Sequence, residues 1–212
     1  MIILRIRNFK NAQETIDSCP YIIKNPTIYK GKYQQLFNNR NPIHLEIGMG
    51  KGKFIIEMAL KYPQINFIGI EKYTSIIARA AQRAGAIELT NLRLIEMDAL
   101  ILDTVFDHEI SCIYLNFSDP WPKTGHSHRR LTSPEFLTIY DKIFKSNSQI
   151  VQKSDNMALI EYSIASFKQN GYILEEINYD LENSSIENIM TEYETKFVKL
   201  GQKIGYIKAT KK

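Results

Sequence analysis

The residues best suited to chemistry lie where an apolar segment gives way to a proline-rich turn. The β-prone run 110–117 stops at Ser118-Asp119, and Pro120 and Pro122 then prevent helix formation and strand pairing. We therefore expect Asp119 to follow a strand at the carboxyl edge of a sheet, where open α/β proteins bind ligands. A basic loop comes next, with Lys123, His126, His128, Arg129 and Arg130. Taken alone, this stretch also fits a proline-rich turn with a solvated basic tip.

A glycine turn provides a second set of candidate residues, with the spacing Glu46-x-Gly48-x-Gly50-x-Gly52. Glycines let a ligand approach the backbone closely. Glu71 ends the next strand about 20 residues on, where a carboxylate can bind ribose hydroxyls, and Asp98 follows the third strand, within reach of an adenine amino group. A nicotinamide dinucleotide fits less well, because the Gly-x-Gly-x-x-Gly spacing is absent and Glu46 would face a pyrophosphate. The pattern favours S-adenosylmethionine, which has a ribose, no phosphate and a cationic methionine end.

An alternation of strands and helices has to position these residues. The periodicity predicts strands over 43–47, 66–71, 92–97, 110–117, 149–153, 173–179 and 204–209, and helices over 53–62, 74–86, 134–144 and 157–170. Such alternation is typical of βαβ units. We expect an α/β fold with a mostly parallel seven-stranded sheet and helices on both faces over residues 43–212. Residues 1–42 lack clean periodicity and are predicted to be a basic N-terminal arm packed on or near this domain.

The charge distribution points to a polyanionic partner. Residues 1–43 hold seven Lys or Arg against two acidic residues, the segment from Lys196 to Lys212 holds six lysines and no acid, and Glu175 to Glu194 holds seven acids and no Lys or Arg. The chain lacks a long apolar run and a signal-peptide pattern, and Cys19 and Cys112 have no metal-ligand spacing. We therefore expect a cytoplasmic protein with no membrane contact. The sequence leaves a monomer and a homodimer both open.

Four segments in order resemble the bacterial tRNA (guanine-N7-)-methyltransferases. They are Asn116-Phe-Ser-Asp-Pro-Trp-Pro-Lys123, Arg129-Arg130-Leu131-Thr132, Lys153-Ser-Asp155 and Thr191-Glu-Tyr-Glu-Thr-Lys-Phe197, and the glycine turn 46–52 also matches. The resemblance covers most of the chain and implies a Rossmann-like class I methyltransferase fold. Two positions depart from the family pattern: His128 stands where Lys is usual, and Ser154 replaces Thr.

The resemblance also implies a set of site residues. The S-adenosyl-L-methionine site would be lined by Glu46, Gly48, Gly50, Gly52, Glu71, Asp98 and Asp119, with Asp119 as the active-site residue. The guanosine would contact Lys123, Asp155, Thr191, Glu192, Tyr193 and Glu194. The RNA would meet the loop Gly125, His126, Ser127, His128, Arg129 and Arg130. The implied reaction is methylation of N7 of the variable-loop guanine, tRNA position 46.

The chemistry of guanine N7 limits what the protein has to do. N7 carries a lone pair and no proton, so a general base is not obligatory, and alignment and charge stabilisation suffice. We expect the carboxylate of Asp119, Asp155 or Glu194 to grip the N1–H and 2-amino edge, because a carboxylate facing N7 or O6 would repel. Trp121 is interpreted as a wedge that fixes the Asp119 turn, with base stacking as the alternative. His126 and His128 lack further metal-ligating partners, so no metal is expected.

Two other functions fit part of the sequence. An RNA or DNA exocyclic-amine methyltransferase would explain Asp119-Pro-Trp-Pro122, although the second proline follows the aromatic residue. A non-catalytic RNA-binding module would explain the charge pattern, but the intact glycine turn and Glu71 argue against it.

Overall fold

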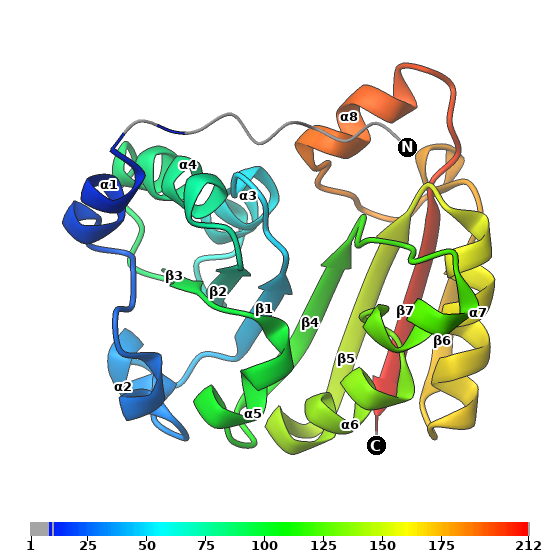
Figure 1. Ribbon diagram of the computed structural model, residues 1–212, viewed down its shortest axis with the longest axis horizontal. Helices are drawn as coiled ribbons and strands as arrows, with labels where there is room; N and C mark the ends of the chain where they lie inside the picture. The colour runs from blue at the N-terminus through cyan, green and yellow to red at the C-terminus, as the bar shows by residue number, and fades with distance from the viewer. Residues whose placement is uncertain (1–8, 10, 212) are drawn as a thin grey trace.

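The computed structural model describes Phe9 and residues 11–211, which form a twisted seven-stranded sheet with helices on both faces (Figure 1). The strand order is β3-β2-β1-β4-β5-β7-β6. The strands are β1 (Ile43–Ile47), β2 (Asn66–Glu71), β3 (Leu92–Glu96), β4 (Ile110–Asn116), β5 (Phe144–Ser154), β6 (Ile173–Asn178) and β7 (Gly205–Lys211). The first five run parallel, whereas β7 is antiparallel to both of its neighbours. The predicted α/β class and mostly parallel seven-stranded sheet are confirmed.

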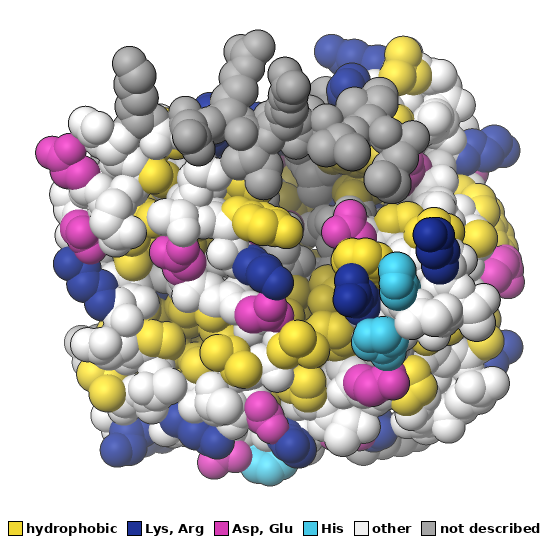
Figure 2. All heavy atoms as spheres, in the orientation of Figure 1, with side chains coloured by type: hydrophobic (Ala, Val, Ile, Leu, Met, Phe, Trp, Pro, Cys, Tyr) yellow, Lys and Arg dark blue, Asp and Glu magenta, His cyan; other side chains and the backbone are white. Residues whose placement is uncertain are grey.

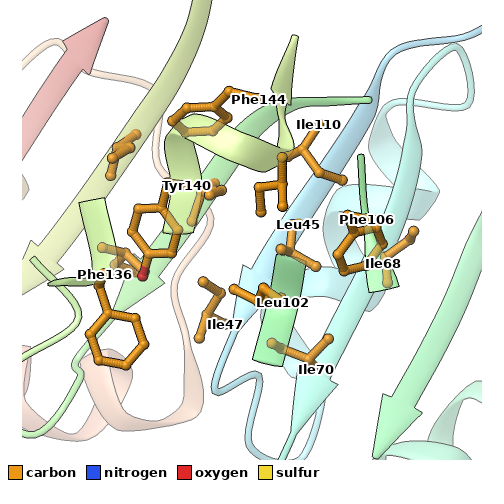
Figure 3. Packing of buried hydrophobic residues seen from close by; sticks show 14 of the residues in the cluster. Leu45, Ile47, Ile68, Ile70, Leu102, Phe106, Ile110, Phe136, Tyr140 and Phe144 are labelled. Atoms are coloured by element: carbon orange, nitrogen blue, oxygen red, sulfur yellow. The ribbon is translucent and has the colours of Figure 1, made fainter. Parts of the chain in front are cut away.

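Successive side chains along each strand point to opposite faces of the sheet, and each face packs against its own set of helices. Leu45, Ile47, Ile68 and Ile70 point to a core shared with α5 (Leu102–Val105), α6 (Pro134–Ile143) and α7 (Met157–Gln169), part of which Figure 3 shows. Phe67 and other side chains of opposite parity pack under α3 (Lys53–Lys61) and α4 (Thr74–Gly85). Both faces of the parallel strands are therefore covered, which explains their nearly continuous apolar sequences.

The described part of residues 1–42 is folded onto the domain. It contains α1 (Ala12–Ser18), the 3₁₀ turn η1 (Pro26–Tyr29) and α2 (Tyr33–Phe37). The backbone from Tyr21 to Ile23 hydrogen-bonds to Leu94, so it adds a short bridge to the edge of β3. Tyr33 is fully buried against Phe106. The basic residues Arg5, Arg7 and Lys10 lie outside the described residues.

Strand β5 and helix α8 (Glu192–Val198) differ from the sequence prediction, which also did not include the short helices α1, α2 and α5. Strand β5 begins directly after α6 and has 11 residues, because the polar stretch 145–148 continues the strand instead of forming a loop. Helix α8 was not predicted, although Thr191 and Glu194 form a complete capping box at its start. Short 3₁₀ turns η2 (Ala99–Ile101), η3 (Thr124–Arg129) and η4 (Leu181–Asn183) complete the chain. Among the described residues, no helix has the length and apolar character that crossing a membrane requires.

Candidate active site

The parallel strands bring five acidic residues to one edge of the sheet. Glu46 lies near the end of β1, Glu71 ends β2, and Asp98, Asp119 and Asp155 follow β3, β4 and β5 directly or within a short turn. Because β1 to β5 are neighbours and point the same way, all five positions lie at the carboxyl edge. This is the arrangement that the sequence predicted, and it is where sheets of this kind bind ligands.

Glu71 is held by backbone N–H groups at the glycine turn. One carboxylate oxygen accepts hydrogen bonds from the N–H groups of Lys72 and Tyr73 at 2.9 and 3.0 Å, and the other accepts one from Gly50 at 3.2 Å. Burial nevertheless raises the pKa of Glu71 above its ordinary value. Gly52 closes the turn at φ 78°, where a Cβ atom would lie 2.9 Å from the Cβ of Ala80 on α4. The turn is thus locked between β2 and two helices.

Glu46 is a buried carboxylate with one unsatisfied oxygen. Its Oε1 accepts a hydrogen bond from Asn116 Nδ2 at 2.8 Å, whereas Oε2 has no partner among the described residues, and neither has Asn116 Oδ1. Burial raises the pKa of Glu46 to about 7, against the opposing effects of Asn116 and Lys153. A buried polar atom without a hydrogen-bond partner destabilises the folded state, and most buried polar atoms in proteins have a partner. A cationic group at this edge would supply a donor for Oε2.

Asp98 takes part in two contacts within the protein. Its carboxylate accepts from Lys72 Nζ at 2.7 Å and from the N–H of Leu100 at 3.0 Å. Burial opposes ionisation, but these hydrogen bonds outweigh it and lower the pKa of Asp98. Because Lys72 is exposed, its ammonium can leave Asp98 at little cost.

A row of polar side chains crosses the sheet beneath α3. Glu46 on β1, Asn116 on β4 and Lys153 on β5 share a face, and Asn116 and Lys153 are paired in the strand register. The Lys153 side chain is 2% exposed, and its ammonium lies 4.9 Å from the centre of the Phe54 ring and donates to Glu194 Oε2 at 2.7 Å. Burial lowers the pKa of Lys153, and Glu194 and Glu46 oppose that shift. The row therefore joins the glycine turn to α8 through a buried ion pair.

Further cations tie the acidic segment 187–194 to α3 and α4. Lys153 also donates to Asn188 Oδ1 and to the carbonyl of Ile189, both at 2.9 Å, and Lys53 donates to the carbonyl of Met190 at 2.7 Å. Glu187 pairs with Lys61, and Glu192 pairs with Arg83 and Lys51. The carboxylates of Glu192 and Glu194, expected to contact guanosine, are thus engaged by cations of the protein, and Thr191 caps α8. In this structure the side chains of all three residues therefore have partners within the protein.

Tyr193 and Asp155, two further members of the expected guanosine set, are in direct contact. The Tyr193 hydroxyl donates to Asp155 Oδ2 at 3.2 Å. The Tyr193 ring stacks on Phe197 with 4.1 Å between centroids and lies 5.0 Å from the ring of Phe117, just ahead of Asp119. Burial and Asp155 raise the pKa of Tyr193 to about 12, so its hydroxyl remains a donor. Helix α8 therefore places an aromatic side chain beside the Asp119 turn.

The Asp119 turn and the loop after it are more exposed. Asp119 and Lys123 are exposed, as are Gly125, His128 and Arg129, and Figure 2 shows His and Lys or Arg side chains gathered on this face. The Trp121 ring, half-buried, lies among loop side chains, with Arg129 Cζ 4.9 Å and the His126 ring 5.8 Å from its centre. The interpretation of Trp121 as a core wedge therefore does not hold. Arg130, half-buried, donates to the carbonyls of Pro120 and Trp121.

Sequence reasoning gave no role to two residues that organise this edge, Asn116 and Lys153. Two features of the sequence could have indicated these roles. Asn116 and Lys153 lie at the ends of buried strands, and the Thr-x-x-Glu capping pattern at Thr191 predicts the start of a helix that contains Glu194. Within the described ranges, no three histidine, cysteine or acidic side chains come together in a way that suits a metal ion.

Comparisons with known proteins identify the family of the chain. A family model described as "Putative methyltransferase" matches residues 40–207. A curated tRNA (guanine-N(7)-)-methyltransferase from a Geobacillus species is 49% identical over 204 residues, 95% of this chain and 93% of the relative. The protein of the same name from Oceanobacillus iheyensis is 49% identical over 209 residues, 97% of this chain and 98% of the relative.

Solved structures agree with the fold. The 16S rRNA methyltransferase KamB superposes with a TM-score of 0.64 at 15% identity, covering 85% of this chain and 92% of that one. A SAM-dependent methyltransferase from Archaeoglobus fulgidus superposes with a TM-score of 0.55 at 16% identity, covering 88% and 94%. With nearly full-length relatives at almost half identity and a matching family model, the chain belongs to the tRNA (guanine-N(7)-)-methyltransferase family.

Proposed function

We propose that the protein transfers a methyl group from S-adenosyl-L-methionine to N7 of the variable-loop guanine of tRNA. The observation that carries the proposal is the gathering of Glu46, Glu71, Asp98, Asp119 and Asp155 at one edge of the sheet, in a chain of this family. We also propose a cytoplasmic location, which the proposed tRNA substrate supports.

The residues at the glycine turn fit the proposed cofactor. Cβ atoms built at Gly48 and Gly50 would meet nothing within 4 Å, so the turn leaves open space beside its backbone. The unpartnered Oε2 of Glu46 suits the cationic methionine end, and Glu71 and Asp98 suit the ribose hydroxyls and the adenine amino group. When bound, the sulfonium supplies an activated methyl group. The role of the chain is to orient that group and to stabilise positive charge.

Asp119 is proposed to act by position and charge. Methylation leaves the guanine ring cationic, and a carboxylate at the N1–H and 2-amino edge both selects guanine and offsets that charge. Asp155, oriented by Tyr193 at 3.2 Å, is proposed to share this role. The ring of Tyr193, 36% exposed, offers a surface against which an unstacked base can lie. The exposed cations Lys123 and Arg129 are proposed to meet RNA phosphates.

Nucleoside analysis of tRNA incubated with the protein and labelled cofactor tests the proposal. We expect 7-methylguanosine in the wild type. Asp119→Ala should abolish turnover with little loss of tRNA affinity, and Glu88→Ala, an exposed acid ahead of β3 at the opposite edge, should leave both unchanged. A methylated exocyclic amine would indicate the alternative enzyme, and unmodified tRNA that nevertheless binds would indicate an RNA-binding module.

A further inference from the structure

The turn that carries Asp119 adopts an unfavourable backbone conformation. Phe117 and Trp121 have φ angles of 53° and 40°, in the left-handed region that side chains other than glycine rarely enter. The two prolines of the turn, Pro120 and Pro122, have no N–H with which to stabilise it. Such conformations persist where surrounding contacts impose them. Some part of the fold therefore has to hold this turn in place.

Arg130 contacts the Trp121 end of this turn, whereas at the other end the N–H of Phe117 donates to the carbonyl of Lys153 at 2.8 Å. The Nε of Arg130 donates to the carbonyl of Pro120 and its Nη2 to the carbonyl of Trp121, both at 3.0 Å. The guanidinium also lies over the ring of Tyr162 on α7, with Cζ 4.1 Å from the ring centre. A guanidinium is a planar group with donors in fixed directions. Two hydrogen bonds to successive carbonyls therefore set the orientation of the peptides that follow Asp119, as well as their position.

The backbone beside Arg130 is anchored in the interior. The hydroxyls of the buried residues Thr132 and Ser163 are 2.8 Å apart, and Ser166 Oγ donates to the carbonyl of Thr132 at 2.6 Å. Ser133, also buried, caps α6 and donates to the carbonyl of His128. Arg130 thus connects the Asp119 turn to α6 and α7, two helices packed against the sheet.

Arg129, its neighbour in sequence, lies in a different environment. Arg129 is exposed and its guanidinium stacks on the face of the Trp121 ring, whereas Arg130 is half-buried with two of its donors engaged by the protein. We propose that Arg130 is a positioning residue that holds Asp119 in place through the backbone of residues 120–121, while Arg129 faces RNA. This proposal rests on the proposed function, and it separates two arginines that the sequence groups together as RNA contacts.

A conservative substitution shows whether Arg130 acts as a clamp, through its two hydrogen bonds to the carbonyls of Pro120 and Trp121, or as a contact to RNA phosphate. Arg130→Lys keeps the charge and loses the planar fork, so a phosphate contact would survive and the clamp would not. We expect Arg130→Lys and Arg130→Ala to lower kcat at saturating tRNA by about 10- to 100-fold, with the tRNA Kd within about twofold of wild type. Arg129→Ala, the contrasting variant, should mainly weaken tRNA binding and reduce its salt slope by about 1. The proposal is overturned if folded Arg130→Lys has the kcat of the wild type. It is also overturned if this variant loses tRNA affinity while its kcat is unchanged.

A second measurement does not depend on activity. Trp121 is the only tryptophan in the chain, so its fluorescence reports the turn directly. Releasing its carbonyl in Arg130→Lys should shift the emission and increase quenching by acrylamide, and unchanged fluorescence in a folded variant contradicts the clamp. Thermal unfolding verifies that each variant is folded. If Arg130→Ala does not fold, the measurements on Arg130→Lys test whether Arg130 holds the turn. If the wild type produces no 7-methylguanosine, the proposed function fails, and the fluorescence still decides whether Arg130 holds the turn.

Discussion

Replacing Lys153 with methionine tests the buried ion pair beneath α3. The substitution keeps an unbranched side chain of similar length and removes the ammonium that donates to Glu194, Asn188 and the carbonyl of Ile189. Glu194 is 1% exposed, so its carboxylate is left in the interior without its cation. The hydrogen bonds from Asn188 and the N–H of Thr191 remain but carry no full charge.

The usual cost of breaking a buried ion pair sets the expected loss. Removing one partner typically destabilises a protein by about 3–5 kcal/mol, because the remaining charge is left buried and uncompensated. We expect Lys153→Met to lower the free energy of unfolding by about 3–4 kcal/mol at neutral pH, the lower part of that range, because the hydrogen bonds from Asn188 and Thr191 remain.

Urea and thermal unfolding followed by circular dichroism measure this loss. For a chain of this size the expected loss corresponds to a fall in Tm of roughly 6–16 °C. Lys203→Met is the control, because Lys203 pairs with Asp180 at the surface, with its side chain 68% exposed, and its removal should leave the unfolding midpoint close to wild type. The double variant Lys153→Met, Glu194→Gln removes both charges and should recover most of the stability.

Two results would refute this reasoning. One is a Lys153→Met protein as stable as wild type at pH 7. The other is a double variant no more stable than the single one, because the loss would then come from lost packing or hydrogen bonds rather than from an uncompensated carboxylate.

Three further outcomes follow from the same edge of the sheet. Burial raises the pKa of Glu46 to about 7, so the free energy of unfolding should decline as the pH rises from about 4.5 to 7 and the carboxyl group ionises. Glu46→Gln should remove up to about 3 kcal/mol of this decline, measured by urea unfolding across the same pH range. Gly52→Ala should destabilise by about 1–3 kcal/mol, because its Cβ would meet Ala80 at 2.9 Å in addition to the strain of a positive φ. Gly50→Ala shares the positive φ but has open space, so it should lose less stability, and it should bind cofactor more weakly in calorimetry. Tyr193→Phe should change stability by less than about 1 kcal/mol, because its hydrogen bond to Asp155 is exposed, and should lower kcat in the methylation assay if that bond orients Asp155.

Sequence patterns predicted the elements whose structure depends mainly on residues that are neighbours in the sequence. The glycine turn, the strands of the parallel sheet and the helix start at Ser133-Pro134 were predictable because each depends on backbone geometry over a few residues. The start of β5 was mispredicted because residues 145–148 are polar, whereas the pairing of Phe144 with Ile110 on β4 and of Ser148 with Lys211 on β7 extends the strand toward α6. Helices α1 and α2 were missed for a similar reason, since both are short and are stabilised by packing against the domain.

The sequence alone determined that acidic residues gather at one edge, because each follows a strand and parallel strands end on the same side. It did not determine which cation each acid would meet. Lys153 and Glu194 are separated by 41 positions, and their pairing depends on how α8 returns over the sheet. The same limit applies to Arg129 and Arg130. They are adjacent and identical in type, yet the exposed Arg129 lies over the Trp121 ring and Arg130 donates to the carbonyls of the Asp119 turn, because side-chain direction is set by the packed backbone and not by residue type.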